Sequence, residues 1–187
     1  MRSLTSLFDD HRSRHDHRDI RFIALRPIRP EDREAFTAFL RGLGDRTRSL
    51  RFLTQKNRFT ARELDYLCEV DQDRHVAWVA IDLSTGREQI VGEARFVRLA
   101  DEPGVAEFGI AIADVLQGNG LGGKLMRVLG DEAARLGLGT PRGFVRSDNA
   151  AMIGFLDRRG GRKQQDHRDV LRIGLPVTAL ARASAAA

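Results

Sequence analysis

Apolar residues repeat along much of the chain with the spacing of an amphipathic helix. Phe36, Phe39 and Leu43 follow this period after Pro30, and Gly44 ends it. A capping-box sequence opens a second such stretch at residue 60, and two more occur in the second half of the chain. The pattern predicts helices over residues 30–43, 60–68, 121–136 and 149–159.

Between these helices the apolar residues are arranged as in β-strands. Residues 76–81 are continuously apolar, which is typical of a strand covered on both faces. Turn sequences at Thr85-Gly86 and Pro103-Gly104 separate this strand from the next two and predict an antiparallel meander. The predicted strands are 20–28, 76–81, 90–97, 105–113, 143–147 and 170–175. The order β-α-α-β-β-β-α-β-α-β indicates a mixed α+β fold with a central, mostly antiparallel sheet flanked by helices.

Length and composition predict one domain. The chain has 187 residues, of which 42% are hydrophobic, enough for one sizeable core. We expect this domain over residues 20–178, after a polar tail at 1–19 and before a low-complexity tail at 179–187. His11, His15 and His17 lie close together in the first tail, as in some metal sites, but their polar surroundings favour a tail that binds no metal.

The net charge of +5 does not indicate a nucleic-acid-binding protein. The arginines of the chain are scattered among acidic residues and form no basic block. A basic surface that suits an anionic cofactor is therefore the simpler interpretation. Apolar stretches fall short of the roughly 20 residues that span a bilayer. Together with a single cysteine, Cys68, this predicts a cytoplasmic protein with no membrane partner and no internal disulfide.

The most informative segment is residues 116–124, Leu-Gln-Gly-Asn-Gly-Leu-Gly-Gly-Lys, at the start of a predicted helix. Backbone N–H groups at such a helix end suit a pyrophosphate. A nucleotide triphosphatase loop would need Ser or Thr where the chain has Leu125. A dinucleotide site would need an acidic residue about 20 positions later, and Asp148 comes too late.

The spacing Gln117-x-x-Gly120-x-Gly122 resembles the acyl-CoA loop of the GNAT family of N-acetyltransferases. Ala106-Glu107-Phe108 before the loop and Asp148-Asn149 after it strengthen this resemblance, which covers about residues 20–175. The resemblance implies a GNAT-like fold of the predicted order, acetyl-CoA as co-substrate and no metal.

The resemblance also implies which residues contact acetyl-CoA. Backbone groups of one strand pair with the pantetheine arm where that strand splays from residues 145–147. Asn149, which also suits a helix N-cap, is a further cofactor contact. The implied strand contacts are Ile110, Ala111 and Ile112, and the implied pyrophosphate loop is Gln117, Gly118, Asn119, Gly120, Leu121, Gly122 and Gly123.

Glu107 is the candidate catalytic residue. A carboxylate is costly to bury in an apolar strand, and strand alternation places it on one face with Gly109 and Ala111. It matches the glutamate that acts as general base in the resembled enzymes; the alternative is a surface glutamate paired with an arginine such as Arg95. Many members supply a tyrosine as general acid, and the matching position here is Leu156.

The predicted function is therefore acetyl transfer from acetyl-CoA to an amine. Residues 50–53 and 75–80 resemble bacterial protein-lysine acetyltransferases, which implies a protein lysine as acceptor, for example on an acyl-CoA synthetase. A small-amine or antibiotic N-acetyltransferase of the same fold is an alternative. A non-catalytic acyl-CoA-binding sensor is another, and it would keep the glycine loop without needing Glu107.

Overall fold

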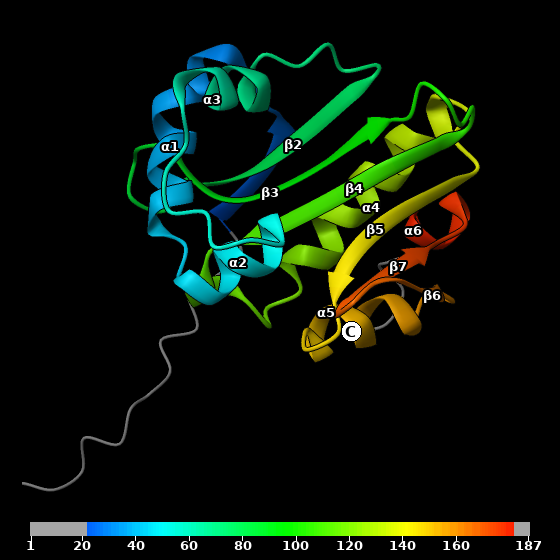
Figure 1. Cartoon of the computed structure of the whole chain (residues 1–187). Helices are drawn as coiled ribbons and strands as arrows, with labels where there is room; N and C mark the ends of the chain where they lie inside the picture. The colour runs from blue at the N-terminus through cyan, green and yellow to red at the C-terminus, as the bar shows by residue number, and fades with distance from the viewer. Residues whose placement is uncertain (1–21, 182–187) are drawn as a thin grey trace, which may run out of the picture.

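A computed structural model describes residues 22–181, which form a seven-stranded sheet with helices on both faces (Figure 1). The strands are β1 (Ile23–Pro27), β2 (His75–Asp82), β3 (Gln89–Arg98), β4 (Val105–Ile112), β5 (Thr140–Arg146), β6 (Arg162–His167) and β7 (Val170–Gly174). The α-helices are α1 (Arg33–Gly42), α2 (Asp45–Phe52), α3 (Ala61–Cys68), α4 (Leu121–Arg135), α5 (Ala150–Asp157) and α6 (Val177–Ala181), with short 3-10 turns η2 (Pro30–Asp32) and η3 (Asp114–Leu116).

The strand order is β1-β2-β3-β4-β5-β7-β6. Neighbouring strands pair antiparallel except β4 and β5, which run parallel. The predicted meander is confirmed as β2, β3 and β4, and so is the mostly antiparallel mixed α+β architecture.

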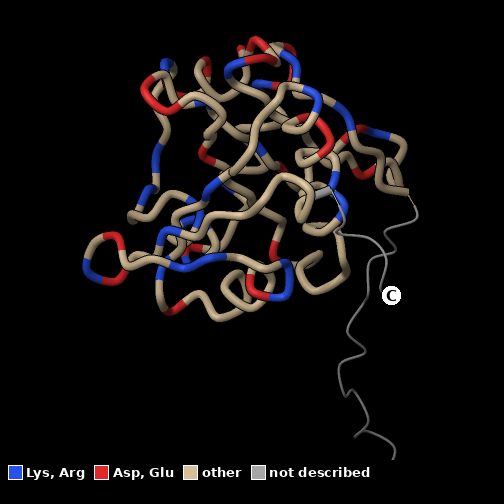
Figure 2. The backbone as a smooth tube through the Cα atoms, turned by 90° about the vertical axis from the view of Figure 1, so that its right-hand side faces the viewer, with Lys and Arg blue, Asp and Glu red and all other residues tan. Residues whose placement is uncertain are grey.

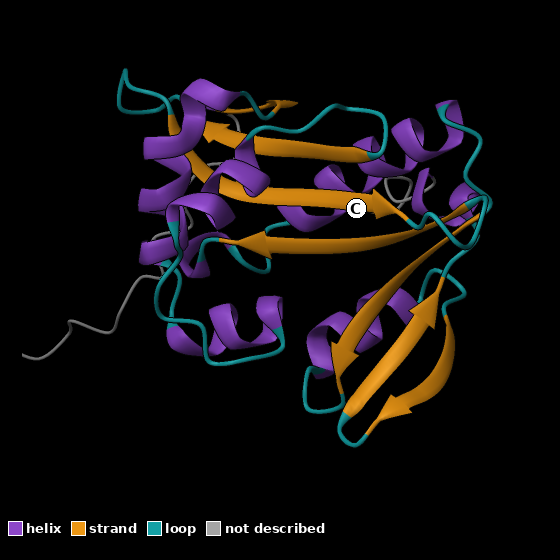
Figure 3. Ribbon diagram, turned by 45° about the horizontal axis from the view of Figure 1, so that its top comes forward, coloured by secondary structure: helices purple, strands orange, loops and turns teal. Residues whose placement is uncertain are grey.

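A fork opens in the middle of the sheet. β4 and β5 pair over only three positions, ending at Glu107 opposite Arg142. Beyond that point the two strands diverge, as Figure 3 shows. A β-carbon on Gly143 would lie 2.7 Å from the Phe108 ring, so the glycine admits this ring beside β5 where the fork begins.

The sheet separates two apolar cores because successive side chains point to opposite faces. On one face α4 buries Leu125, Met126 and Leu129 against the central strands. On the other face α1 and α3 cover a second core that includes Phe36 and Ala111. Two covered faces explain why β2 is apolar at nearly every position.

The predicted element order lacks three observed elements. Helix α2 buries no residue and β6 is exposed along its whole length, so neither carries a periodic apolar pattern. Helix α6 runs to Ala181 and buries Leu180, so the domain boundary predicted after residue 178 falls inside a packed helix. The predicted tail at 1–19 lies outside the described residues.

Charge is distributed without separation into basic and acidic halves. Figure 2 shows Lys and Arg positions interspersed with Asp and Glu positions along the chain. Over residues 22–181, no helix is both long and apolar enough to cross a membrane.

Candidate active site

The fork between β4 and β5 brings the predicted site residues together. Glu107 marks its closed end, and β4 then leads through η3 into the glycine loop at its open end. Helix α2 lies over the fork on one side of the sheet (Figure 3). The site therefore consists of a free strand edge, a helix N-terminus and a carboxylate.

The glycine loop has the backbone conformation that its sequence suggests. Gly118 and Gly120 both have φ of +79°, a left-handed conformation that other residues adopt at a cost, although a side chain would meet no atom there. Gly122 is different, because its φ is ordinary and an added β-carbon would make only normal contact, 3.7 Å, with Ile110. The fold itself therefore does not require glycine at 122.

The side chain of Gln117 faces the protein. Its amide donates hydrogen bonds to the carbonyl of Ile112 at 3.0 Å and to Oγ1 of Thr47 at 3.1 Å. These bonds fasten the loop to β4 and α2. The contact predicted between Gln117 and a pyrophosphate therefore depends on its backbone.

The three strand residues predicted to hold the pantetheine arm lie on the open part of β4. Ile110, Ala111 and Ile112 pair with β3 on one side, and β5 does not pair with them on the other. Their free edge has the hydrogen-bonding pattern that an extended ligand arm completes.

Asn149 stands at the N-terminus of α5. Its Oδ1 accepts a hydrogen bond of 3.1 Å from the backbone N–H of Met152, so its predicted capping function is confirmed. Its contact with the cofactor remains a prediction. Leu156, matched from the sequence to the family's tyrosine, is fully buried.

Glu107 is accessible and lies in an ion pair. Its side chain is 37% exposed, and Arg142 donates to its Oε1 at 3.1 Å. Arg142 also bonds Glu102 at 2.9 Å, so one guanidinium serves two carboxylates. Burial opposes the charge on Arg142, but the hydrogen bonds to Glu102 and Glu107 raise its pKa. Arg95, suggested from the sequence as a partner of Glu107, pairs with Glu93 instead.

Glu93 is a second carboxylate on this face of the sheet, directly across from Ala111. It accepts hydrogen bonds of 2.7 Å from Arg51 and Arg95, and its side chain is 1% exposed. Burial alone would raise the pKa of Glu93, but the two guanidinium groups hold it below its usual range. Because Glu93 is buried and committed to two arginines, Glu107 is the better placed base.

His75 completes this buried network. Its Nε2 lies 3.0 Å from NH1 of Arg95, which also donates to the carbonyl of Leu67. Burial and the charge of Arg95 lower the pKa of His75 to about 4, so the ring is neutral at pH 7 and its Nε2 accepts from the guanidinium. Glu93 was not predicted from the sequence, although a charge within an apolar strand is the same signal that singled out Glu107.

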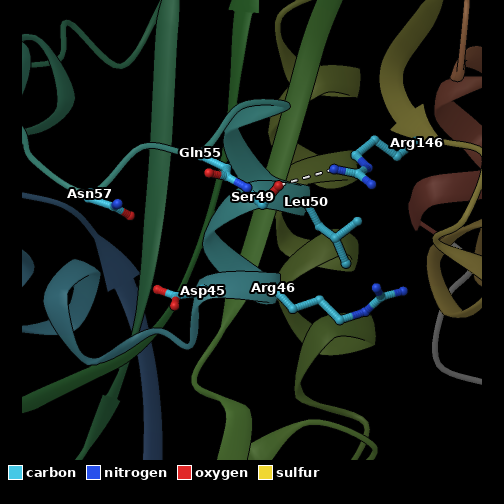
Figure 4. A pocket seen from close by; sticks show the side chains of 7 residues that line it. All are labelled: Asp45, Arg46, Ser49, Leu50, Gln55, Asn57 and Arg146. Atoms are coloured by element: carbon cyan, nitrogen blue, oxygen red, sulfur yellow. Dashed lines mark hydrogen bonds between the residues drawn. The ribbon is translucent and has the colours of Figure 1, made fainter.

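A pocket of ≈ 280 Å³ opens between α2 and the end of β5 (Figure 4). Arg146 reaches across from β5, donating to Oγ of Ser49 at 3.2 Å and to the carboxylate of Asp148 at 2.9 Å. The remaining lining residues come from α2 and the segment after it: Asp45, Arg46, Leu50, Gln55 and Asn57. None was predicted, because α2 itself was missed.

Within the described part of the chain, the other cysteine, histidine and acidic groups are not arranged as sites. Burial raises the pKa of the Cys68 thiol to about 11, which keeps it protonated at neutral pH. Among residues 22–181 no three His, Cys, Asp or Glu side chains are grouped to hold a metal ion. His11, His15 and His17 lie outside these residues.

The fold is shared with solved structures. The GNAT domain of the S. lividans protein PAT superposes with a TM-score of 0.74 at 20% identity, covering 81% of this chain and 89% of that domain. A spermidine N-acetyltransferase from Vibrio cholerae, in complex with CoA and spermine, gives a TM-score of 0.67 at 18% identity over 85% of this chain and 98% of that one.

Proteins related in sequence are also acetyltransferases. An acetyltransferase of Pseudomonas aeruginosa is 35% identical over 147 residues, 75% of this chain and 78% of that protein. The acetyltransferase Pat of Mycolicibacterium smegmatis is 33% identical over 136 residues; the match covers 73% of this chain and only 40% of the longer Pat. The family model described as acetyltransferase (GNAT) domain matches residues 23–162. With this match and the fork geometry together, the chain belongs to the GNAT family of acetyltransferases.

Proposed function

We propose that this protein transfers the acetyl group of acetyl-CoA to the side-chain amine of a lysine on another protein. One observation carries the proposal: the fork places an accessible carboxylate, Glu107, on the strand whose free edge leads to the glycine loop. A sensor that only bound acyl-CoA would need the edge and the loop but no such carboxylate.

Acetyl-CoA fits the open end of the fork. The pyrophosphate would lie at the start of α4, where Gly118 and Gly120 expose backbone N–H groups and the first turn holds no acidic residue. The pantetheine arm would then run along Ala111 and its neighbours as an added strand. The Vibrio cholerae relative, whose structure contains CoA, supports this choice of cofactor.

The chemistry needs a base and a polarised carbonyl. A lysine amine, with a pKa of ~10.4, is protonated at neutral pH and must lose a proton before its nitrogen can attack the thioester carbon. Glu107 takes this proton, directly or through a water, while an N–H of the β4 edge stabilises the developing oxyanion. The C–S bond then breaks and CoA leaves as a thiolate, since the pKa of its thiol is ~8.5. The nitrogen gives up its second proton, to the thiolate or to water, and the neutral amide remains.

The pocket beneath α2 is the proposed acceptor entrance. It lies on the same face of the sheet as Glu107, and its lining of Asp45, Arg46 and Arg146 suits a charged protein surface better than an apolar ligand. The resemblance of residues 50–53 and 75–80 to protein-lysine acetyltransferases supports a protein acceptor. The spermidine enzyme, which is similar at 18% identity, supports the alternative of a small polyamine.

The test is an acceptor screen with isotopically labelled acetyl-CoA. The protein is incubated with a cell lysate, with a purified acyl-CoA synthetase, and with a panel of polyamines, amino acids and aminoglycosides. We expect label on protein lysines with the wild type and strongly reduced label with Glu107→Gln. Efficient labelling of small amines with no labelled protein would replace the lysine proposal by the small-amine alternative.

A further inference from the structure

Helix α2 is held over the fork by polar contacts along its length and by Phe52 at its C-terminal end, which packs against the core that α1 and α3 cover. Thr47 and the N–H of Gly44 both bond the carboxylate of Asp114 just before the glycine loop, at 2.6 and 2.9 Å. At the other end of the helix, Arg51 bonds Glu93 in β3 at 2.7 Å. Because no residue of α2 is fully buried, its position also depends on these polar side chains.

Arg51 makes an unusually close approach to β4. A β-carbon on Gly109 would lie 2.7 Å from both Cζ and NH1 of the Arg51 guanidinium, closer than side-chain carbons come to other atoms. Only glycine at this position lets the guanidinium rest on the strand. Glu93, which is bonded to Arg95 as well, fixes the other side of the same group.

This contact lies between the two parts of the proposed reaction centre. Gly109 is two residues from Glu107 and two from Ala111 on the same face of β4, about 7 Å from each at the rise of a strand. Arg51 belongs to the same helix as Ser49 and Leu50, which line the acceptor pocket. A shift of Arg51 would therefore move the pocket wall relative to Glu107.

We propose that Arg51 is an acceptor-positioning residue, which uses the gap left by Gly109 and the anchor of Glu93 to hold α2 as the wall of the acceptor pocket. This inference rests on the proposed function only for the identity of the acceptor that Arg51 positions. The attachment of α2 through Arg51 can be measured without any substrate.

Hydrogen exchange of residues 45–52 tests the attachment in the protein alone. Arg51→Met removes the charge and the planar group, and Gly109→Ala fills the space beneath that group. Each change should speed exchange in α2 by about 10-fold, because the helix opens locally. Arg62→Met on the exposed surface of α3 and Gly42→Ala at the end of α1 are the matched controls and should leave α2 unchanged.

Kinetics with a purified acyl-CoA synthetase and with spermine test the positioning. We expect Arg51→Met to raise the KM for the acceptor by about 10-fold or more with a smaller change in kcat, and to leave acetyl-CoA affinity within about 2-fold. Gly109→Ala should act in the same way, and the double variant should be no worse than Arg51→Met, since the alanine acts only through Arg51. Arg51→Lys should restore little, because an ammonium cannot replace the planar group.

The outcomes separate the two proposals. If α2 exchanges at the wild-type rate in Arg51→Met, or if the acceptor KM is unchanged in an active enzyme, Arg51 does not position the acceptor. If the wild type acetylates neither acceptor but the exchange result holds, the proposed acceptors are wrong and the attachment of α2 by Arg51 stands.

Discussion

At the residue scale, two carboxylates on one face of the sheet have different environments. Glu107 is open to solvent with one arginine partner, whereas Glu93 is buried with two. The sequence could single out Glu107 because it interrupts an apolar strand in a recognisable motif. It could not reveal that Arg142 rather than Arg95 pairs with it, since this depends on β5 lying beside β4.

Replacing Glu107 tests its function as base. Glu107→Gln keeps the size of the side chain but cannot accept a proton, so turnover should fall by about 10² to 10⁴. Acetyl-CoA affinity, measured by calorimetry, should stay the same because the residue lies at the closed end of the fork. Glu102→Gln, which also loses a carboxylate bonded to Arg142, serves as a control and should retain most activity. Equal turnover in Glu107→Gln and wild type, where chemistry limits the rate, would remove Glu107 from the mechanism.

The buried ring of His75 should make the stability of the fold depend on pH. Its pKa is lowered from 6.5 to about 4, so the folded protein prefers the neutral ring. In the unfolded chain His75 binds a proton more readily than in the folded protein. The free energy of unfolding should therefore fall as the pH drops from about 6.5 towards 4, and this group should account for about 2–4 kcal/mol of the fall. His75→Gln keeps an acceptor for Arg95 without the titration.

Comparing His75→Gln with the wild type separates the effect of the histidine on stability from the effect of the carboxylates, which also titrate in acid. Urea unfolding at a series of pH values should show a shallower loss of stability for His75→Gln between pH 6.5 and 4. Parallel curves for the variant and the wild type would contradict a buried neutral His75.

At the scale of elements, sequence analysis found the helices and strands that bury an apolar face and missed those that do not. Strands β2 to β4 and helix α4 were predictable because each one packs into a core. Helix α2 has no fully buried residue and β6 pairs only with β7 at the sheet edge, so neither leaves a hydrophobic period. The missing α2 also concealed the acceptor pocket that it lines.

At the start of α4, the backbone of Gly120 is left-handed and favours glycine, whereas that of Gly122 is not. Gly122→Ala adds a methyl group that the fold accommodates, and the change should be neutral or stabilise α4 by up to about 1 kcal/mol. Acetyl-CoA affinity should fall by about 10-fold, because the methyl group stands where the helix end meets the pyrophosphate. The experiment combines thermal unfolding with calorimetry.

Gly42→Ala is the matched control, since the same change in α1 lies far from the loop in sequence and an added β-carbon there meets no atom. Gly120→Ala is less informative because its left-handed backbone adds strain of about 1–2 kcal/mol. Unchanged affinity in Gly122→Ala would show that the cofactor does not approach this turn.

At the scale of the whole molecule, a net charge of +5 favours an acidic partner. If the acceptor is a folded protein, its docking should be partly electrostatic. The kcat/KM for acetylation of an acyl-CoA synthetase should therefore fall as salt rises from 50 to 500 mM, because screening shortens the reach of surface charges. Free lysine as acceptor is the control. An equal effect of salt on the two acceptors would exclude a charged surface that attracts the protein acceptor.

The most direct measurement of the central claim is calorimetric titration of the wild-type protein with acetyl-CoA, NAD and ATP under the same conditions. A fork with a free β4 edge and a glycine loop of this spacing should bind acetyl-CoA at one site and neither of the other two ligands. Clear binding of NAD or ATP, with no heat from acetyl-CoA, would contradict the assignment of this fork as an acyl-CoA site.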